Sequence, residues 1–187
     1  MNKDIEKILV TEEELYSITK QLGETITKDY AGKKLLVVGV LKGSIYFLTD
    51  LTRHIDLTCH IDFIQASSYG ESTESSGIVK ITKDIAEDLS GFDVLLVEDI
   101  LDTGRTLKHI CDMLSERNPE SIAVVTLLDK PSRRVADIKA DYVGVDVPNE
   151  FVVGYGLDYN QYYRNLPYIG VLRHEVYENN ELTTAVH

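Results

Sequence analysis

The chain has 187 residues, of which 43% are hydrophobic and 27% charged, as in an ordinary soluble globular protein. Its formal net charge of −12 at pH 7 argues against nucleic-acid binding, because a phosphate backbone would be repelled. No apolar run is long enough to span a bilayer, and the first residues lack the apolar core of a signal peptide. Cys59 and Cys111 lie in apolar patterns far apart in the sequence and predict reduced core residues. We therefore expect one domain over residues 1–187, in the cytoplasm, with no nucleic-acid or membrane partner.

A first helix is predicted from the residues that follow Val10. Thr11 is placed as its N-cap, and Glu14 completes a capping box three residues later. Val10 and Leu15 are spaced as a hydrophobic staple, and Gly32 is expected to end the helix. The apolar stripe that should pack on the core consists of Leu15, Ile18, Leu22 and Ile26.

Residues 34–40 predict a buried strand, which is followed by a small polar turn with the sequence Leu41-Lys42-Gly43-Ser44. The free N–H groups of this turn and the ammonium of Lys42 suit an anion. The same residues would equally serve as a plain connecting turn with a solvated lysine, and the local sequence does not separate the two interpretations. A second helix should then bury Ile45, Phe47, Leu48 and Leu51.

Residues 57–66 alternate between apolar and polar side chains, which predicts a half-buried strand. Its inward residues would be Leu57, Cys59, Ile61 and Phe63. Residues 67–77 are rich in serine and glycine. They predict either a long hairpin loop or a functional lid over a reaction that must exclude water.

The stretch from Val94 to Leu107 organises the chain. Four apolar residues predict a strand buried on both faces, and the carboxylates Glu98 and Asp99 follow where it should end. Residues 102–106 then lead into a helix whose buried face is Leu107, Ile110, Cys111 and Leu114. Because ligands bind at the carboxyl ends of parallel strands, the hydroxyls, helix N–H groups and glycine of this loop suit a phosphate. The two carboxylates suit a hard cation that accompanies it.

The last third of the chain adds two further segments with polar side chains after strands. Residues 122–128 predict a buried strand that ends in Asp129 and Lys130. A lysine at such a position is usually solvated, but the carboxyl end of a strand is also where ligands bind. Residues 141–148 predict one more strand and a turn. Residues 151–167 crowd aromatic side chains around Asp158 and Arg164, which fits either a core or a binding surface.

In this order along residues 9–172, these motifs resemble type I phosphoribosyltransferases, and in particular the bacterial hypoxanthine-guanine phosphoribosyltransferases. The stretch around Glu98 to Thr106 resembles the phosphoribosyl-pyrophosphate loop of the whole type I family. The segment from Phe151 to Arg164 resembles the hypoxanthine-guanine branch alone. The resemblance implies an α/β fold with a mostly parallel central sheet flanked by helices and a small hood formed by the terminal segments.

The resemblance also implies a purine salvage reaction that joins hypoxanthine or guanine to phosphoribosyl pyrophosphate and releases pyrophosphate. Asp102 would be the general base that takes the purine N7 proton, although its position also suits a helix-capping role. The 5′-phosphate would be held by Asp102, Thr103, Gly104, Arg105 and Thr106. The pyrophosphate would be held by Lys42, Gly43 and Arg164.

The same resemblance implies which residues bind the base and which bind the metal ion. The 6-oxopurine would be bound by Lys130, Phe151, Val152 and Asp158, with Lys130 donating to the 6-oxo group. Mg²⁺ would lie at Glu98, Asp99 and Asp158, where it offsets the charge that builds on the departing pyrophosphate. Ser68 and Tyr69 match a serine-tyrosine pair that the family carries on a lid.

Three points stay open at this level. The pattern does not separate hypoxanthine and guanine from xanthine as the preferred base. A regulatory protein that senses phosphoribosyl pyrophosphate without catalysis is a second alternative, although such proteins usually carry a DNA-binding segment, and this acidic chain has no basic appendage. The resemblance implies a homodimer or homotetramer, which no feature of one sequence decides.

Overall fold

A computed structural model describes residues 3–68 and 79–178, without the side chains of residues 67 and 68. The proposed lid residues Ser68 and Tyr69 and the expected loop 67–77 therefore lie outside the described side chains. The elements in chain order are β1 (Ile5–Val10), α1 (Glu12–Asp29), β2 (Leu35–Leu41), α2 (Ile45–Arg53), β3 (His60–Ser68), β4 (Val79–Lys83), β5 (Asp93–Leu101), α3 (Arg105–Ser115), β6 (Ser121–Asp129), the 3₁₀ helix η1 (Pro131–Arg133), β7 (Tyr142–Asp146), β8 (Val152–Val153), β9 (Ile169–Leu172) and α4 (His174–Glu178).

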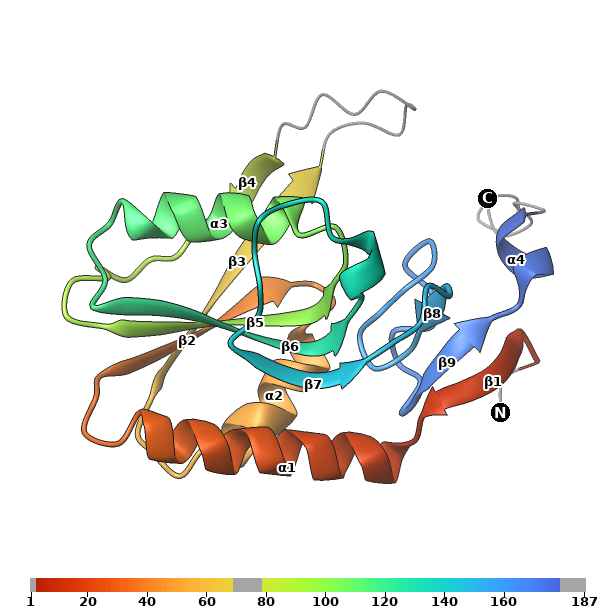
Figure 1. The fold of residues 1–187 in the computed structure, drawn as a ribbon, viewed down its shortest axis with the longest axis horizontal. Coiled ribbons are helices and arrows are strands. Elements are labelled where there is room, and N and C mark those ends of the chain that lie inside the picture. Colours follow the sequence, from red (N-terminus) through yellow and green to blue (C-terminus); the bar gives the residue numbers. More distant parts are fainter. Residues whose placement is uncertain (1–2, 69–78, 179–187) are drawn as a thin grey trace.

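A six-stranded sheet in the order β4-β3-β2-β5-β6-β7 forms the centre of the molecule. Its neighbours are parallel except for the antiparallel pair β3-β4. Helix α3 covers one face, while α1 and α2 cover the other (Figure 1). The expected α/β fold with a mostly parallel sheet between helices is confirmed.

The middle strands form where the sequence is apolar without interruption. Residues 35–40 of β2 and Val94 to Val97 of β5 are all buried, as a strand covered on both faces requires. Thr11 caps α1, and its side chain and that of Glu14 each accept from the other residue's backbone N–H. The predicted capping box is therefore confirmed.

Four details of the predicted elements are wrong. Helix α1 ends at Asp29 with Tyr30 as its C-cap, so Gly32 lies in the turn beyond the helix end. Ile45 opens α2 but is 42% exposed, and Ile61 of β3 is 49% exposed. Strand β5 continues to Leu101, so the two carboxylates lie within the strand and not after it. Alternation along the chain reports which residues share a face, but not whether another element covers that face.

A second, three-stranded sheet in the order β1-β9-β8 joins the two ends of the described chain. We call this sheet, together with residues 154–168 between β8 and β9, the hood. It lies beside the carboxyl ends of the central strands (Figure 1). Ile5, Val153 and Leu172 form its small buried core, and the expected hood from the terminal segments is confirmed. Among the described helices, none is long and apolar enough to cross a membrane.

Candidate active site

The adjacent strands β2, β5 and β6 bring the polar segments of the sequence to one edge of the sheet. Lys42 and Gly43 follow β2, the loop from Asp102 to Thr106 follows β5, and Lys130 follows β6. We call residues 102–106 the phosphate loop and Glu98 with Asp99 the acidic pair. Because parallel strands end at the same edge, these groups form one site although they lie far apart in the sequence.

The phosphate loop leads directly into α3, and Gly104 is the N-cap of that helix. Gly104 has φ +79°, and a Cβ atom there would lie 2.6 Å from the Ile138 side chain, so both backbone and space require glycine. Asp102 is therefore not the cap. A cavity of about 100 Å³ lies against the loop, with Glu98, Thr103 and Thr106 among its lining residues. Free N–H groups at a helix start suit a phosphate in this cavity.

Arg134, which the sequence did not single out, fixes the phosphate loop from behind. Its guanidinium donates to the carbonyl oxygens of Asp102 at 2.9 Å and of Leu101 at 3.0 Å, and it forms an ion pair with Asp129. The Thr103 carbonyl also accepts two backbone N–H groups at 3.1 Å. The loop is thus held by bonds to its backbone, which leaves its hydroxyls available. No sequence signal distinguished Arg134 from a solvated surface arginine.

The carboxylate of Asp102 is paired in this structure. Arg133 Nε lies 2.7 Å from Asp102 Oδ1, and both side chains are partly exposed. The sequence did not single out Arg133 either. An incoming ligand that needs a proton acceptor would therefore find the Asp102 carboxylate oriented by Arg133.

The acidic pair is buried without enough partners. Glu98 Oε2 is inaccessible to solvent and has no hydrogen-bond partner among the described residues. Burial, together with the neighbouring charge of Asp99, raises the pKa of Glu98 well above its ordinary value. Burial also raises the pKa of Asp99 to about 6, although the Ile100 N–H donates to Asp99 Oδ1 at 2.9 Å. Two carboxylates in this state would be stabilised by a cation.

A magnesium ion fits the chemistry of this donor set. Mg²⁺ prefers carboxylate oxygens and usually takes one or two from the protein and the rest from phosphates or water. The described residues contain no cluster of three or more histidine, cysteine or acidic side chains that could hold a metal ion. The acidic pair could therefore contribute to a site that is completed by oxygens of a bound phosphate.

Gly43 brings the turn after β2 against the acidic pair. A Cβ atom on Gly43 would lie 1.7 Å from Asp99 Oδ2, so only glycine allows the carboxylate to approach this closely. Gly156 of the hood meets the same turn from the other side, since its Cβ would lie 1.9 Å from the Gly43 carbonyl oxygen. The Leu41–Lys42 peptide bond is cis. Three segments of the chain thus meet at Gly43.

Two cations converge beside this turn. Lys42 Nζ lies 3.2 Å and Arg164 Nη2 3.1 Å from the same atom, Gln161 Oε1. Arg164 also donates to the Gly156 carbonyl at 2.6 Å and pairs with Asp158 at 2.8 Å. An anion could replace the Gln161 oxygen between the two cations. Gln161 was not predicted as a site residue, because an uncharged side chain in an aromatic segment carries no anion signal.

A larger cavity of about 390 Å³ lies between the phosphate loop and the hood. Lys130, Phe151 and Val152 line it, as does Asp102. Lys130 is only 6% exposed and donates to the Glu150 carbonyl at 2.6 Å. Burial lowers the pKa of its ammonium, which is consistent with a polar group placed in a mostly closed site. Asp158, which the sequence also assigned to a base, lies with Arg164 instead.

The Phe151 ring is 40% exposed and already takes part in aromatic contacts. The Tyr177 ring of α4 stacks on it with 5.1 Å between centroids, and the Tyr159 ring meets its edge at 5.7 Å. Tyr177 also lines the larger cavity. The sequence offers no signal of this contact, because Tyr177 is a lone tyrosine in an acidic segment.

The acidic pair generates a prediction about stability. Glu98→Gln should raise the melting temperature of the ligand-free protein, because it removes a buried charge that lacks a partner. We expect a gain of about 1–3 kcal/mol in the free energy of unfolding, with roughly 2–4 °C for each kcal/mol. Because the pKa of Glu98 is raised in the folded state, the folded protein binds this proton at a higher pH than the unfolded chain does. The free energy of unfolding that Glu98 takes away therefore grows as the pH rises. The gain should therefore shrink toward acid pH.

Thermal unfolding at several pH values measures this effect, with the exposed Glu116→Gln as the matched control. A lower melting temperature for Glu98→Gln at neutral pH would show that the carboxylate is satisfied by groups that stabilise it.

Comparisons with known proteins agree with this arrangement. Residues 4–160 match the model of the phosphoribosyl transferase domain family. The chain is 54% identical to a hypoxanthine-guanine phosphoribosyltransferase of Streptococcus pneumoniae and 55% identical to one of Staphylococcus aureus, over 96% of this chain and 99% and 100% of theirs. A crystal structure of a Staphylococcus aureus hypoxanthine phosphoribosyltransferase superposes with a TM-score of 0.90 at 55% identity, over 93% of this chain and 95% of that one. The chain therefore belongs to the phosphoribosyltransferase family, in the branch of the hypoxanthine-guanine phosphoribosyltransferases.

Proposed function

We propose that the protein is a purine salvage enzyme that transfers the phosphoribosyl group of phosphoribosyl pyrophosphate to hypoxanthine or guanine. The products are the purine nucleotide and pyrophosphate. One observation carries the proposal: Asp102 lines both the small cavity at the phosphate loop and the larger cavity at Lys130. A ribose phosphate in the first and a purine in the second would meet at Asp102.

Asp102 acts in this proposal as the general base. The purine attacks C1′ of the ribose, and its N7 proton passes to the Asp102 carboxylate. Arg133 pairs with one oxygen of that carboxylate and so orients it before the proton arrives. The cavity positions are consistent with a carboxylate between base and ribose.

Cationic side chains and backbone N–H groups bind the 5′-phosphate and the pyrophosphate in this proposal. Thr103, Gly104, Arg105 and Thr106 hold the 5′-phosphate at the start of α3. Lys42, Gly43 and Arg164 hold the pyrophosphate, in the place that Gln161 Oε1 now shares with the two cations. Glu98, Asp99 and Asp158 would hold Mg²⁺, which would supply charge neutralisation on the leaving pyrophosphate.

The base is selected by polar groups in a cavity that polar and apolar residues line together. Lys130 donates to the 6-oxo group, which adenine lacks, so oxopurines are favoured. Phe151 offers its ring for stacking, and the backbone of Val152 faces the base edge. Ser68 and Tyr69 would close over the reaction. A cytoplasmic homodimer or homotetramer is part of the proposal, on the resemblance to this family.

A transfer assay with labelled phosphoribosyl pyrophosphate tests the proposal directly. Hypoxanthine, guanine, xanthine and adenine are offered in turn, and nucleotide and pyrophosphate are both measured. We expect transfer to hypoxanthine and guanine. Transfer to xanthine in strong preference would replace the proposed substrates. Binding of phosphoribosyl pyrophosphate with no transfer to any base would point to a regulatory protein instead.

Lys130→Met should weaken the use of both bases. The substitution keeps an apolar chain of similar length but removes the charged donor to the 6-oxo group. Charge-assisted hydrogen bonds contribute about 1.5–3 kcal/mol, so we expect a rise of roughly 10- to 100-fold in the KM of hypoxanthine and of guanine. The KM of phosphoribosyl pyrophosphate should stay constant. The exposed Lys139→Met is the matched control, and an unaltered base KM in Lys130→Met would remove Lys130 from the base site.

Asp102→Asn should lower turnover while keeping the shape of the site. General-base catalysis typically contributes about 10²- to 10⁴-fold, so a loss of that order in kcat is expected. Affinity for phosphoribosyl pyrophosphate should change little, because the loop is held through its backbone by Arg134. Steady-state kinetics and calorimetric binding provide both values, with the exposed Asp137→Asn as control. A variant that keeps its turnover, or that loses binding and stability together, would give Asp102 a structural role.

A further inference from the structure

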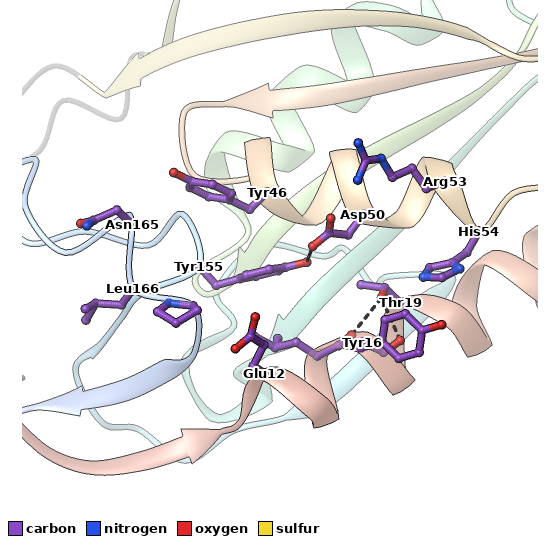
Figure 2. Close-up of a pocket in the computed structure, with 12 residues that line it drawn as sticks. Glu12, Tyr16, Thr19, Tyr46, Asp50, Arg53, His54, Tyr155, Asn165 and Leu166 are labelled. Atoms are coloured by element: carbon purple, nitrogen blue, oxygen red, sulfur yellow. Dashed lines mark hydrogen bonds between the residues drawn. The ribbon is translucent and has the colours of Figure 1, made fainter. Parts of the chain in front are cut away.

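A third cavity, of about 440 Å³, lies between α1, α2 and the hood and takes no part in the proposed reaction. Figure 2 shows the Tyr155 ring of the hood reaching across it toward α2. The Tyr155 hydroxyl donates to Asp50 Oδ2 at 2.6 Å. Tyr155 is only 7% exposed, so this bond joins the hood to α2 in a partly buried position.

Tyr155 can act only as the donor in this bond. Burial, and then the hydrogen bond to Asp50, raise the pKa of its phenol, so the hydroxyl stays protonated at neutral pH. Besides Asp50, the titratable side chains that line the cavity with Tyr155 are Glu12, Tyr16, Tyr46, Arg53 and His54 (Figure 2). The bond is therefore a charge-assisted contact between a neutral phenol and a carboxylate.

Both ends of this bond lead to the proposed pyrophosphate site. Asp50 lies on α2, which begins directly after the turn with Lys42 and Gly43. Tyr155 precedes Gly156, whose carbonyl accepts from Arg164 at 2.6 Å and whose Cα faces the Gly43 carbonyl. Of the two cations that would hold pyrophosphate, Arg164 thus lies in the hood, and Lys42 lies in the turn that leads into α2.

The Tyr155 ring is buried with the main hydrophobic core, and the bond to Asp50 adds to that packing. One side of it borders the cavity, and the Tyr46 ring is its aromatic neighbour at 6.1 Å between centroids. Residues 154–156 all have positive φ, at 102°, 49° and 103°, and Tyr155 is the non-glycine among them. Such a backbone conformation persists when surrounding contacts hold it. The bond to Asp50 is one such contact.

We propose that Asp50 and Tyr155 are a positioning pair, which holds the hood against α2 so that Arg164 and Lys42 keep the spacing that pyrophosphate requires. The inference rests on the proposed function for the identity of the anion. Neither residue touches a reacting atom. Their effect reaches the substrate through Gly156, which contacts the Gly43 carbonyl and whose own carbonyl accepts from Arg164.

The test separates the effect of the Tyr155 hydroxyl from that of its ring, and the effect of the Asp50 charge from that of its shape. Tyr155→Phe removes only the donor, and Asp50→Ala removes the acceptor. We expect each variant to raise the KM of phosphoribosyl pyrophosphate and the inhibition constant of pyrophosphate by about tenfold. The KM of the base should stay constant. Asp50→Asn keeps an acceptor oxygen and should recover most of the affinity.

The double variant Tyr155→Phe with Asp50→Ala should be no worse than either single variant, because both remove the same bond. Tyr16→Phe, on the α1 side of the same cavity, is the matched control and should leave all constants unchanged. Melting temperatures of all variants show whether the fold is kept. If Asp50→Ala unfolds, Tyr155→Phe and Asp50→Asn still decide the question.

Calorimetric binding of magnesium pyrophosphate keeps this test independent of the base. If the wild-type protein binds magnesium pyrophosphate but transfers to no purine, the proposed function is overturned. The positioning pair is then still decided by comparing the pyrophosphate affinities of the variants. Unchanged pyrophosphate affinity in a folded Tyr155→Phe would overturn the positioning pair. An equal loss of base and pyrophosphate affinity would do so as well, since it would indicate a general structural effect.

Discussion

The contact between Gly43 and the Asp99 carboxylate is the constraint on which the rest of the site depends. Asp99 Oδ2 occupies the space where any other residue at position 43 would carry its Cβ atom. This places the turn after β2, with its lysine, against the acidic end of β5. Gly156 of the hood then closes on the same turn. Positions 43 and 156 are both glycine, and the absence of side chains there lets the turn with Lys42, the acidic end of β5 and the hood pack against one another.

The electrostatics of that space are incomplete in the protein alone. Glu98 Oε2 has no partner among the described residues, and burial raises the pKa of both members of the acidic pair. On the opposite side, Lys42 and Arg164 share one amide oxygen. A buried carboxylate oxygen without a partner destabilises the protein until a cation arrives, and an added polyanion would give Lys42 and Arg164 a stronger acceptor than an amide oxygen. The protein therefore gives up stability at the site where magnesium pyrophosphate would restore it.

Local patterns predicted much of the fold and the main residues of the candidate site. The capping box at Thr11 and the apolar runs in β2 and β5 are local signals, and each has one physical reading. The resemblance assigned Asp102, Lys130 and Arg164 to one active site; Asp102 and Lys130 line the same cavity, while Arg164 lies beside Lys42. Strand ends and exposed apolar positions such as Ile61 were missed, because they depend on which element covers a face.

The supporting residues could not be predicted for a related reason. Arg133, Arg134 and Gln161 act through partners that are 3 to 119 positions away in the sequence. Arg133 and Arg134 have neighbours typical of ordinary surface, and Gln161 is an uncharged side chain among aromatic residues, so the local sequence does not reveal these partners. Tyr155 could not be predicted as a supporting residue either. Its aromatic ring is typical of a core residue, and only the structure shows that its hydroxyl donates to Asp50.

Thermal unfolding with magnesium and pyrophosphate, singly and together, tests the central claim about this site most directly. A ligand that binds only the folded state raises its stability in proportion to occupancy. Because the acidic pair and the two cations need opposite partners, the account predicts that magnesium and pyrophosphate together raise the melting temperature by clearly more than the sum of their separate effects. Separate effects that simply add, or a full shift with magnesium alone, would contradict a site that is completed only by the metal and the polyanion together.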